Sequence, residues 1–195
     1  MGSTAAQIGL LLVNTLAGFY MFIVVLRFLL QAVRADFHNP ISQFVVKATT
    51  PVLVPIRKMV PGFGGYDIAA LVLLYILQCL AITASIVMVG WPIEISNIAV
   101  WALLGSAGLF LKLYFWGLLI MIILSWVAPQ SYNPAVMMLH QLTGPVLSKI
   151  RKFMPDMGML DLTPLVAFLL IQVAQIFLRY IAAAAQLPSQ LVLGL

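Results

Sequence analysis

The residues of this sequence best suited to binding another molecule lie in two copies of one basic segment. The first copy, PVLVPIRKMVP, runs from Pro51 to Pro61, and the second, PVLSKIRKFMP, runs from Pro145 to Pro155. Guanidinium and ammonium groups attract phosphates and carboxylates, and arginine binds them through two parallel hydrogen bonds. These segments therefore predict ionic binding of anionic lipids or of a protein partner. The candidate groups are Arg57, Lys58, Lys149, Arg151 and Lys152.

Each basic segment also has the spacing of a helix that lies flat in a membrane interface. At about 100° per residue, Val52, Ile56 and Met59 fall within one arc, while Lys58 lies nearly opposite Ile56. In such a helix the apolar face enters the bilayer and the basic groups stay among the lipid phosphates. Two interpretations remain open: anchoring that only orients the chain, or an additional surface for a lipid or protein partner. Direct nucleic-acid binding is not expected, because three or four basic residues per segment make a small electrostatic footprint.

Lys112 is a different kind of candidate, because it lies near the middle of a long apolar stretch. A cation at the centre of a bilayer costs at least about 2.5 kcal/mol on insertion scales. Either the span is tilted or broken so that Lys112 reaches an interface, or the ammonium faces a polar cavity, a partner's carboxylate or a lipid phosphate. Arg27, near the end of an apolar stretch, is expected to extend to the interface. The amides that could line a cavity are Asn14, Gln78, Gln172 and Gln175.

Residues for catalysis or metal binding are sparse. Cys79 is the one cysteine, which excludes an intrachain disulfide, a CxxC redox pair and a thiolate metal cluster. His38 and His140 are the two histidines, and neither has a partner at the spacing of a zinc or haem site. No nucleophile, base and orienting group form a recognisable set. We therefore expect neither an enzyme nor a protein that carries a metal or cofactor.

The composition places these residues in a membrane protein. Hydrophobic residues make up 64% of the 195-residue chain and charged residues 8%, whereas a soluble domain is about half apolar and about a quarter charged. Apolar stretches of roughly 20 residues, the length that crosses a bilayer, occur four times. We predict an all-α membrane protein with four spans and no soluble domain. The spans cover about 10–33, 68–89, 99–127 and 162–185.

The chain is an internal repeat with a constant offset of 94 residues, as from Pro51 to Pro145. Matched prolines, glycines and aspartates cannot arise from shared apolar composition alone. Each unit reads span, surface segment, span, so both units enter the membrane in the same orientation, related by an axis along the membrane normal. We assign the first unit to 1–94, with a surface segment at 39–61, and the second to 95–195, with a surface segment at 133–155.

Caps and turns define the surface segments. An Asn-Pro pair opens each one, with the asparagine predicted as N-cap and the proline as the first residue of a helix. Thr49–Pro51 and Thr143–Pro145 are expected to end this helix and start a second one. Glycines then turn the chain back, and an aspartate is expected to cap the next span. These positions are Asn39, Pro40, Gly64, Asp67, Asn133, Pro134, Gly158 and Asp161.

Basic residues outside the spans are confined to the two longer connections, and the short connection between the middle spans holds Glu94 as its one charged residue. Positively charged loops stay on the cytoplasmic side. We therefore expect both surface segments to be cytoplasmic and both termini to lie outside. An anionic leaflet attracts each basic group near it by roughly 1 kcal/mol. The basic residues are Arg34, Lys47, Arg57, Lys58, Lys149, Arg151 and Lys152.

The stretches DFHNPISQFVVKATTPVLVPIRKMVPGFGGYD and YNPAVMMLHQLTGPVLSKIRKFMPDMGMLD carry a family likeness. Their shared Asn-Pro…Pro…Ile-Arg-Lys…Pro…Gly…Asp pattern resembles the signature of the YggT family (YggT/YlmG) of integral membrane proteins, in its two-repeat proteobacterial type. The resemblance implies the bacterial inner membrane and a link to osmotic or envelope stress. It assigns no catalytic residues.

These features favour a non-enzymatic scaffold or assembly factor of the inner membrane. It would bind anionic lipids, and either a protein partner or a second copy of itself, through its basic cytoplasmic helices. The alternative is a small pore or ion-handling protein in the osmotic response, with Lys112 facing a path between the two units.

Overall fold

The computed structural model describes residues 4–127, 133–154, 161–188 and 191–195, and every named element in these ranges is a helix. Four of the helices are long and apolar enough to cross a bilayer, as predicted. The shortest has 22 residues, or about 33 Å at 1.5 Å per residue. The membrane helices are α1 (Thr4–Ala32), α3 (Ile68–Val89), α4 (Ile95–Val127) and α6 (Thr163–Ala184), and the surface helices are α2 (Pro40–Met59) and α5 (Pro134–Arg151).

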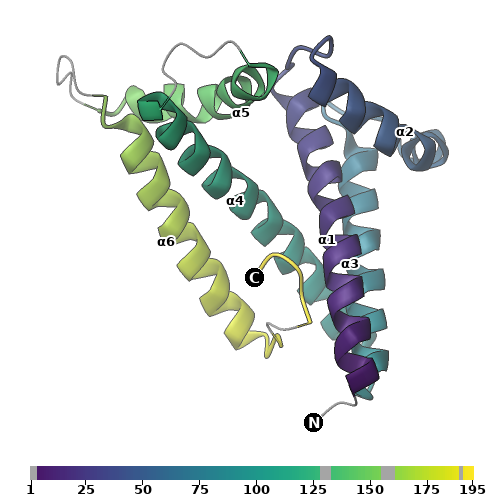
Figure 1. Cartoon of the computed structure of the whole chain (residues 1–195). Helices are drawn as coiled ribbons and strands as arrows, with labels where there is room; N and C mark the ends of the chain where they lie inside the picture. Colours follow the sequence, from purple (N-terminus) through teal and green to yellow (C-terminus); the bar gives the residue numbers. More distant parts are fainter. Residues whose placement is uncertain (1–3, 128–132, 155–160, 189–190) are drawn as a thin grey trace.

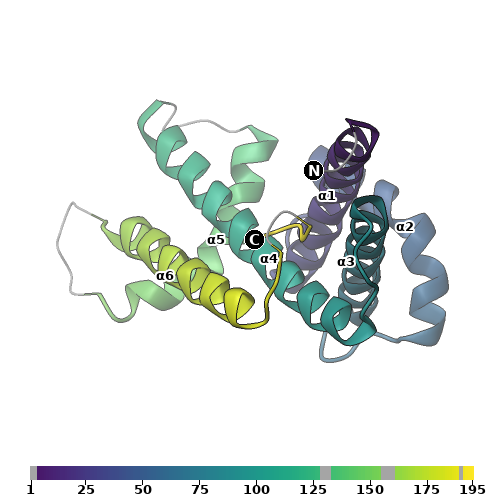
Figure 2. The same cartoon turned by 90° about the horizontal axis from the view of Figure 1, so that it is seen from below.

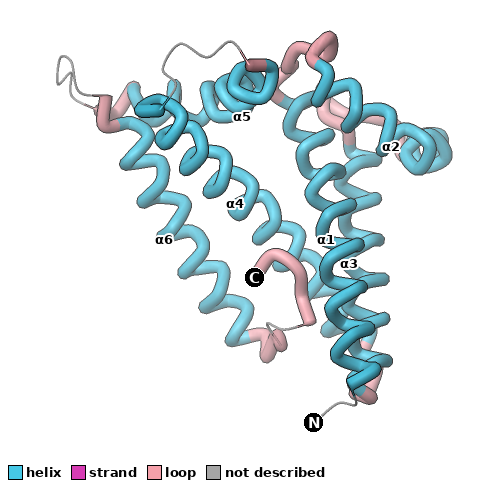
Figure 3. Tube along the Cα trace, viewed as in Figure 1, coloured by secondary structure: helices cyan, strands magenta, loops and turns pink. Residues whose placement is uncertain are grey.

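Both surface helices lie at one end of the four membrane helices (Figure 1). α1 and α3 form one antiparallel pair, α4 and α6 form another, and α2 and α5 cross the end at which each pair is connected. The view from below separates the two pairs, which meet where α4 passes α3 (Figure 2). The tube in Figure 3 shows the same order of span, surface helix and span in both halves. This arrangement confirms the expected tandem of two units with the same direction.

Two membrane helices begin earlier than the apolar stretches suggested. α1 starts at Thr4 rather than near residue 10, and α4 starts at Ile95 rather than near residue 99. Polar residues at a span's end do not stop a helix, so hydropathy alone places the boundary too late. α4 runs unbroken through Lys112 for 33 residues, which excludes a broken third span. Its length of about 50 Å exceeds a bilayer core of about 30 Å, which favours the inclination of α4 to α1 seen in Figure 1.

Each surface segment is one helix, and the expectation of two short helices was wrong. Pro51 and Pro55 lie inside α2, and Pro145 lies inside α5. Just before Pro51, the hydroxyl of Thr49 donates to the carbonyl of Val45 at 2.8 Å. Such bonds back to the preceding turn, together with the missing proline N–H, bend a helix without ending it. In Figure 1 the first turns of α2 are seen from the side and its last turn nearly end-on, as a bent helix requires.

Packing is closest around the first unit. Its core joins α1, α2 and α3 through Leu30, Leu53 and Leu74, none more than 1% exposed. A smaller cluster, which includes Leu118 and Ala167, joins α4, α5 and α6. The outward faces of the membrane helices carry large exposed apolar side chains, which a lipid-facing surface accommodates.

The chain after α6 returns into the middle of the molecule, a feature that the sequence analysis did not anticipate. Residues 191–195 lie against α3 and α4, with Leu191 and Val192 each 4% exposed (Figure 1). Gln78 Nε2 donates to the carbonyl of Leu193 at 2.8 Å. Two glycines of α4 make room, because a Cβ on Gly105 would lie 2.9 Å from Leu193 O and one on Gly108 would overlap the carbonyl of Gly194.

Gly108→Ala should therefore displace residues 191–195 or strain the helix beneath them. Overpacking of this kind typically costs about 1–3 kcal/mol, and here the obstacle is backbone. We expect a lower melting temperature in detergent and faster thiol labelling of a Leu193→Cys reporter in a Cys79→Ser background. Gly117→Ala is the matched control, because its Cβ would first meet Leu139 Cδ2 at an ordinary 3.6 Å. Equal stability of the two alanine variants would contradict the close approach.

Candidate functional site

The Asn-Pro pairs start the two surface helices as predicted. Asn39 Oδ1 accepts a hydrogen bond from the N–H of Ile41 at 2.9 Å, and Asn133 Oδ1 accepts one from the N–H of Ala135 at 2.9 Å. The prolines that follow, Pro40 and Pro134, are the first helical residues. Pro lacks the N–H that a first-turn residue could not use, so it suits this position.

The two starting points also touch each other. Asn39 Nδ2 donates to the carbonyl of Pro134 at 2.7 Å, and the N–H of Asp36 donates to Gln141 Oε1 at 3.1 Å. The beginnings of the two surface helices therefore meet at the centre. This contact joins α2 and α5 into one surface, as expected near an axis that relates the units.

At the far end of each surface helix, an arginine forms an ion pair with the aspartate that precedes the next span. Arg57 pairs with Asp67, with Arg57 Nε 3.3 Å from Asp67 Oδ1, and Arg151 pairs with Asp161. Asp67 stands at the N-cap position of α3 but makes no capping hydrogen bond with its side chain, so the capping role predicted for it was wrong. A carboxylate beside a guanidinium gains more from a charged pair than from one backbone N–H.

The N-cap of α6 is Leu162 and not the predicted Asp161, but Asp161 both pairs with Arg151 and accepts a hydrogen bond from the first turn of α6. Its Oδ1 accepts a hydrogen bond from the N–H of Thr163 at 3.0 Å, in the first turn of α6. Hydrogen bonds from Thr163, and then the pair with Arg151, lower the pKa of the Asp161 carboxyl. A lowered pKa means that this contribution to stability is present above the carboxyl's unfolded pKa and is lost as the pH falls through the folded one.

The sequence analysis missed these pairs, although a signal for them was present. Arginine and aspartate are ten residues apart in both units, from Arg57 to Asp67 and from Arg151 to Asp161. A ten-residue spacing means nothing within a helix, because i and i+10 lie far apart along the axis. It becomes informative only once a turn brings the next span back, here through Gly64 with a φ of +61°. The matching Gly158 lies outside the described residues.

The lysines of the two basic segments have no acidic partner within the described residues. Lys58, Lys149 and Lys152 are exposed and form no ion pair there. We call these three residues the lysine surface. Of the five predicted binding groups, the two arginines are thus engaged in holding the fold, while the three lysines keep free charge. Lysine ammonium groups are strongly hydrated point charges, suited to loose attraction of phosphates.

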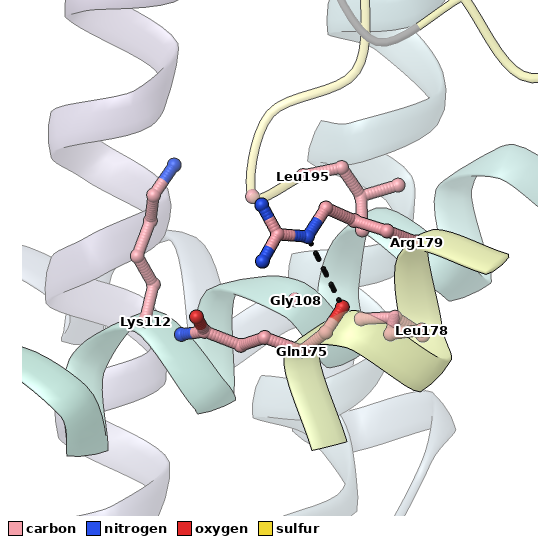
Figure 4. A pocket seen from close by; sticks show the side chains of 7 residues that line it. Gly108, Lys112, Gln175, Leu178, Arg179 and Leu195 are labelled. Atoms are coloured by element: carbon pink, nitrogen blue, oxygen red, sulfur yellow. Dashed lines mark hydrogen bonds between the residues drawn. The ribbon is translucent and has the colours of Figure 1, made fainter. Parts of the chain in front are cut away.

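Lys112 lines a cavity of about 180 Å³ between α4, α6 and the returning chain (Figure 4). Arg179 lines the same cavity and donates through Nε to the carbonyl of Gln175 at 3.4 Å. Lys112 makes no hydrogen bond or ion pair with any described residue, and no carboxylate side chain is among the lining groups. Of the four amides proposed to line a cavity, Gln175 does so, whereas Gln78 is buried against Leu193. We call this space the Lys112 cavity.

A metal centre finds no support in the described ranges, where no three His, Cys, Asp or Glu side chains lie close enough to hold an ion. Cys79 is partly buried in α3. The lysine surface and the Lys112 cavity offer ionic and hydrogen-bonding contacts to an anion.

Comparison with known families matches one family model, CCB3/YggT, to this chain twice. The matches cover residues 6–88 and 100–182, which are shifted by the same offset that relates the two units. The chain belongs to the CCB3/YggT family. The family likeness drawn from the paired Asn-Pro…Asp segments is thereby confirmed.

Relatives within the CCB3/YggT family extend over most of the chain. An uncharacterized protein of Pseudomonas aeruginosa is 43% identical over 92% of this chain and 93% of its own length. The "Uncharacterized protein YggT" of Escherichia coli K12 is 40% identical over 83% of this chain and 84% of its own. A Vibrio alginolyticus protein named for the proC 3' region is 41% identical over 84% and 89%. No solved structure matches the chain.

Removing the carboxylate charge of each arginine–aspartate pair should have unequal effects. Asp67 is 3% exposed, and breaking a buried pair typically costs about 3–5 kcal/mol. In the second pair, the side chains of Arg151 and Asp161 are 64% and 48% exposed, and such pairs are worth up to about 1 kcal/mol. We expect Asp67→Asn to lower the melting temperature in detergent clearly more than Asp161→Asn does.

The double variant Arg57→Asp with Asp67→Arg exchanges the two partners. It tests whether the loss in Asp67→Asn comes from the missing ion pair. It keeps both groups and reverses their order, so it should recover part of the loss of Asp67→Asn. Equal losses for the two single asparagine variants would refute the argument from burial.

Proposed function

We propose that this CCB3/YggT-family protein is a non-enzymatic scaffold or assembly factor of the bacterial inner membrane. Its working part would be the joined surface of α2 and α5, which holds anionic lipids and a protein partner or a second copy of the chain. The observation that carries the proposal is the contact of Asn39 with Pro134, which makes one surface of two helices. The free charges of the lysine surface lie at the two far ends of this joined surface, so they would act on a partner or lipid patch that extends along both helices.

The proposal also requires that this surface face the cytoplasm. Its support is the distribution of charge: the connections that contain α2 and α5 hold the basic residues outside the spans, and Glu94 stands in the connection opposite. Positive loops favour the cytoplasmic side, where anionic lipids add attraction. Both termini would then be outside. The link to osmotic or envelope stress is suggested by the family likeness, and we include it in the proposal.

Reversal of the lysine surface tests the scaffold. The triple variant Lys58→Glu, Lys149→Glu and Lys152→Glu leaves both arginine–aspartate pairs in place, so the fold should remain. With about 1 kcal/mol per charge near an anionic surface, we expect enrichment of anionic lipid around the protein in mixed nanodiscs to fall steeply. Proteins that copurify in mild detergent, identified by mass spectrometry, should be lost as well. Unchanged lipid enrichment together with unchanged copurification would refute the proposal.

The second candidate function is a small anion-conducting pore or ion-handling protein. It is favoured by one observation, the two cations of the Lys112 cavity with no Asp or Glu side chain in the lining. In proteoliposomes, the purified protein alone should then pass anions, and Lys112→Leu should reduce that flux by removing the charge that attracts them. The scaffold predicts instead that Lys112→Leu changes neither lipid enrichment nor copurification. Wild-type protein without any flux would exclude the pore.

A further inference from the structure

A second cavity lies in the first unit, at the end of the membrane helices where the surface helices lie. It measures about 420 Å³, within the range of small-molecule sites, and opens between the end of α1 and the first half of α2. Two cations, two amides, an aromatic ring and one aliphatic side chain form its wall. They belong to Arg27, Gln31, Phe37, Gln43, Val46 and Lys47. We call this space the Arg27 cavity.

Arg27 is a buried cation without an anion of its own. The residue is 8% exposed, its Nε has no hydrogen-bond partner, and its guanidinium lies 5.4 Å from the ring centre of Phe37. No described residue forms an ion pair or hydrogen bond with it. A buried charge left unpaired is strongly unfavourable, so the guanidinium needs an acceptor that the described residues do not supply.

The acidic groups nearby are already engaged. Asp67 is the carboxylate whose charge acts on Arg27, but Asp67 is already paired with Arg57. Asp36 follows α1 but is turned toward His38, whose N–H it accepts at 2.8 Å. Lys47, exposed on α2, adds a further positive charge at the cavity's rim. The Arg27 cavity therefore carries a local excess of positive charge.

We propose that the Arg27 cavity binds the phosphate of one anionic phospholipid headgroup. Arg27 is five residues from the end of α1, or about 7.5 Å along the helix, a depth that matches the headgroup region. The guanidinium fork receives the phosphate, Lys47 adds a point charge, and the amides of Gln31 and Gln43 donate to headgroup oxygens. Val46 and Phe37 offer apolar contact to the lipid's glycerol and upper acyl chain. A lipid reaches this opening from the leaflet itself, which favours it over a free anion.

The residues that form the Arg27 cavity are not repeated in the second unit. Met121 stands where Arg27 would recur, and its sulfur lies 3.1 Å from the hydroxyl of Thr143. Gln141 stands in the place of Lys47 and accepts the N–H of Asp36. Neither cation recurs, so we infer one lipid per chain. The counterparts of Arg27, Gln31, Gln43 and Lys47 are Met121, Ser125, Met137 and Gln141.

This inference rests on the proposed position of α2 in the interface, but not on the scaffold role. Its test is native mass spectrometry of the full chain in neutral detergent, titrated with phosphatidylglycerol, phosphatidylcholine or inorganic phosphate. We expect one phosphatidylglycerol to bind per chain. In Arg27→Gln and in Lys47→Gln its affinity should be lower by about tenfold or more. Arg34→Gln, which removes an exposed positive charge outside both the cavity wall and the lysine surface, is the matched control and should bind like wild type.

Lys47→Gln keeps the test valid if Arg27→Gln fails to fold, because Lys47 is exposed and outside the core. Equal binding of phosphatidylcholine, or unchanged binding in Lys47→Gln, would overturn the proposal. Displacement of the lipid by millimolar inorganic phosphate would overturn it too and would make a free anion the occupant. Failure of the scaffold alone looks different: the triple lysine variant would keep its copurifying proteins, while the single lipid would still depend on Arg27 and Lys47.

Discussion

The ion pair between a surface-helix arginine and the aspartate of the following span is the interaction on which the rest of the arrangement depends. An amphipathic helix in an interface is free to rotate and slide, because apolar burial has no direction. The pairs Arg57–Asp67 and Arg151–Asp161 fix the last turn of each surface helix to the top of the next span. The Asn39 contact fixes the opposite ends to each other. Between these points, α2 and α5 hold one orientation.

Both units contain the arginine–aspartate pair, but they differ in its burial and in their other charged residues. The first pair is buried at Asp67, while the second is largely exposed. Arg27, Lys112 and Arg179 have no counterpart at the repeat offset, and none of the three forms an ion pair within the described part of the chain. Repetition preserves residues that every unit needs in order to fold. The unrepeated cations are costly in a membrane and form no part of the repeated contacts, so they are candidates for function beside the lysine surface.

Sequence reasoning recovered what depends on local pattern and missed what depends on distant contact. Four spans, two units and the Asn39 and Asn133 caps follow from hydropathy and residue spacing, and the structure contains them. Proline rules predicted a break at Pro51, but packing of Leu53 into the core and the back-bonded Thr49 hold one bent helix. The return of residues 191–195 depends on glycines that are far away in sequence, so no local pattern announces it. Whether Asp67 caps α3 or pairs with Arg57 likewise depends on which group lies nearest to it in space.

The separation of arginine from lysine in the basic segments has a consequence for any partner. Arg57 and Arg151 are paired with carboxylates, so their charge is largely neutralised, and loss of the pair that is buried at Asp67 would damage the fold. The lysine surface carries charge that the fold does not use. Salt screens exposed charges strongly and buried pairs weakly, so ionic strength would change what the lysines attract while leaving the helices in place. In the proposed function, such a surface would gain and release an anionic partner without unfolding, because the lysines are not the groups that hold the structure together.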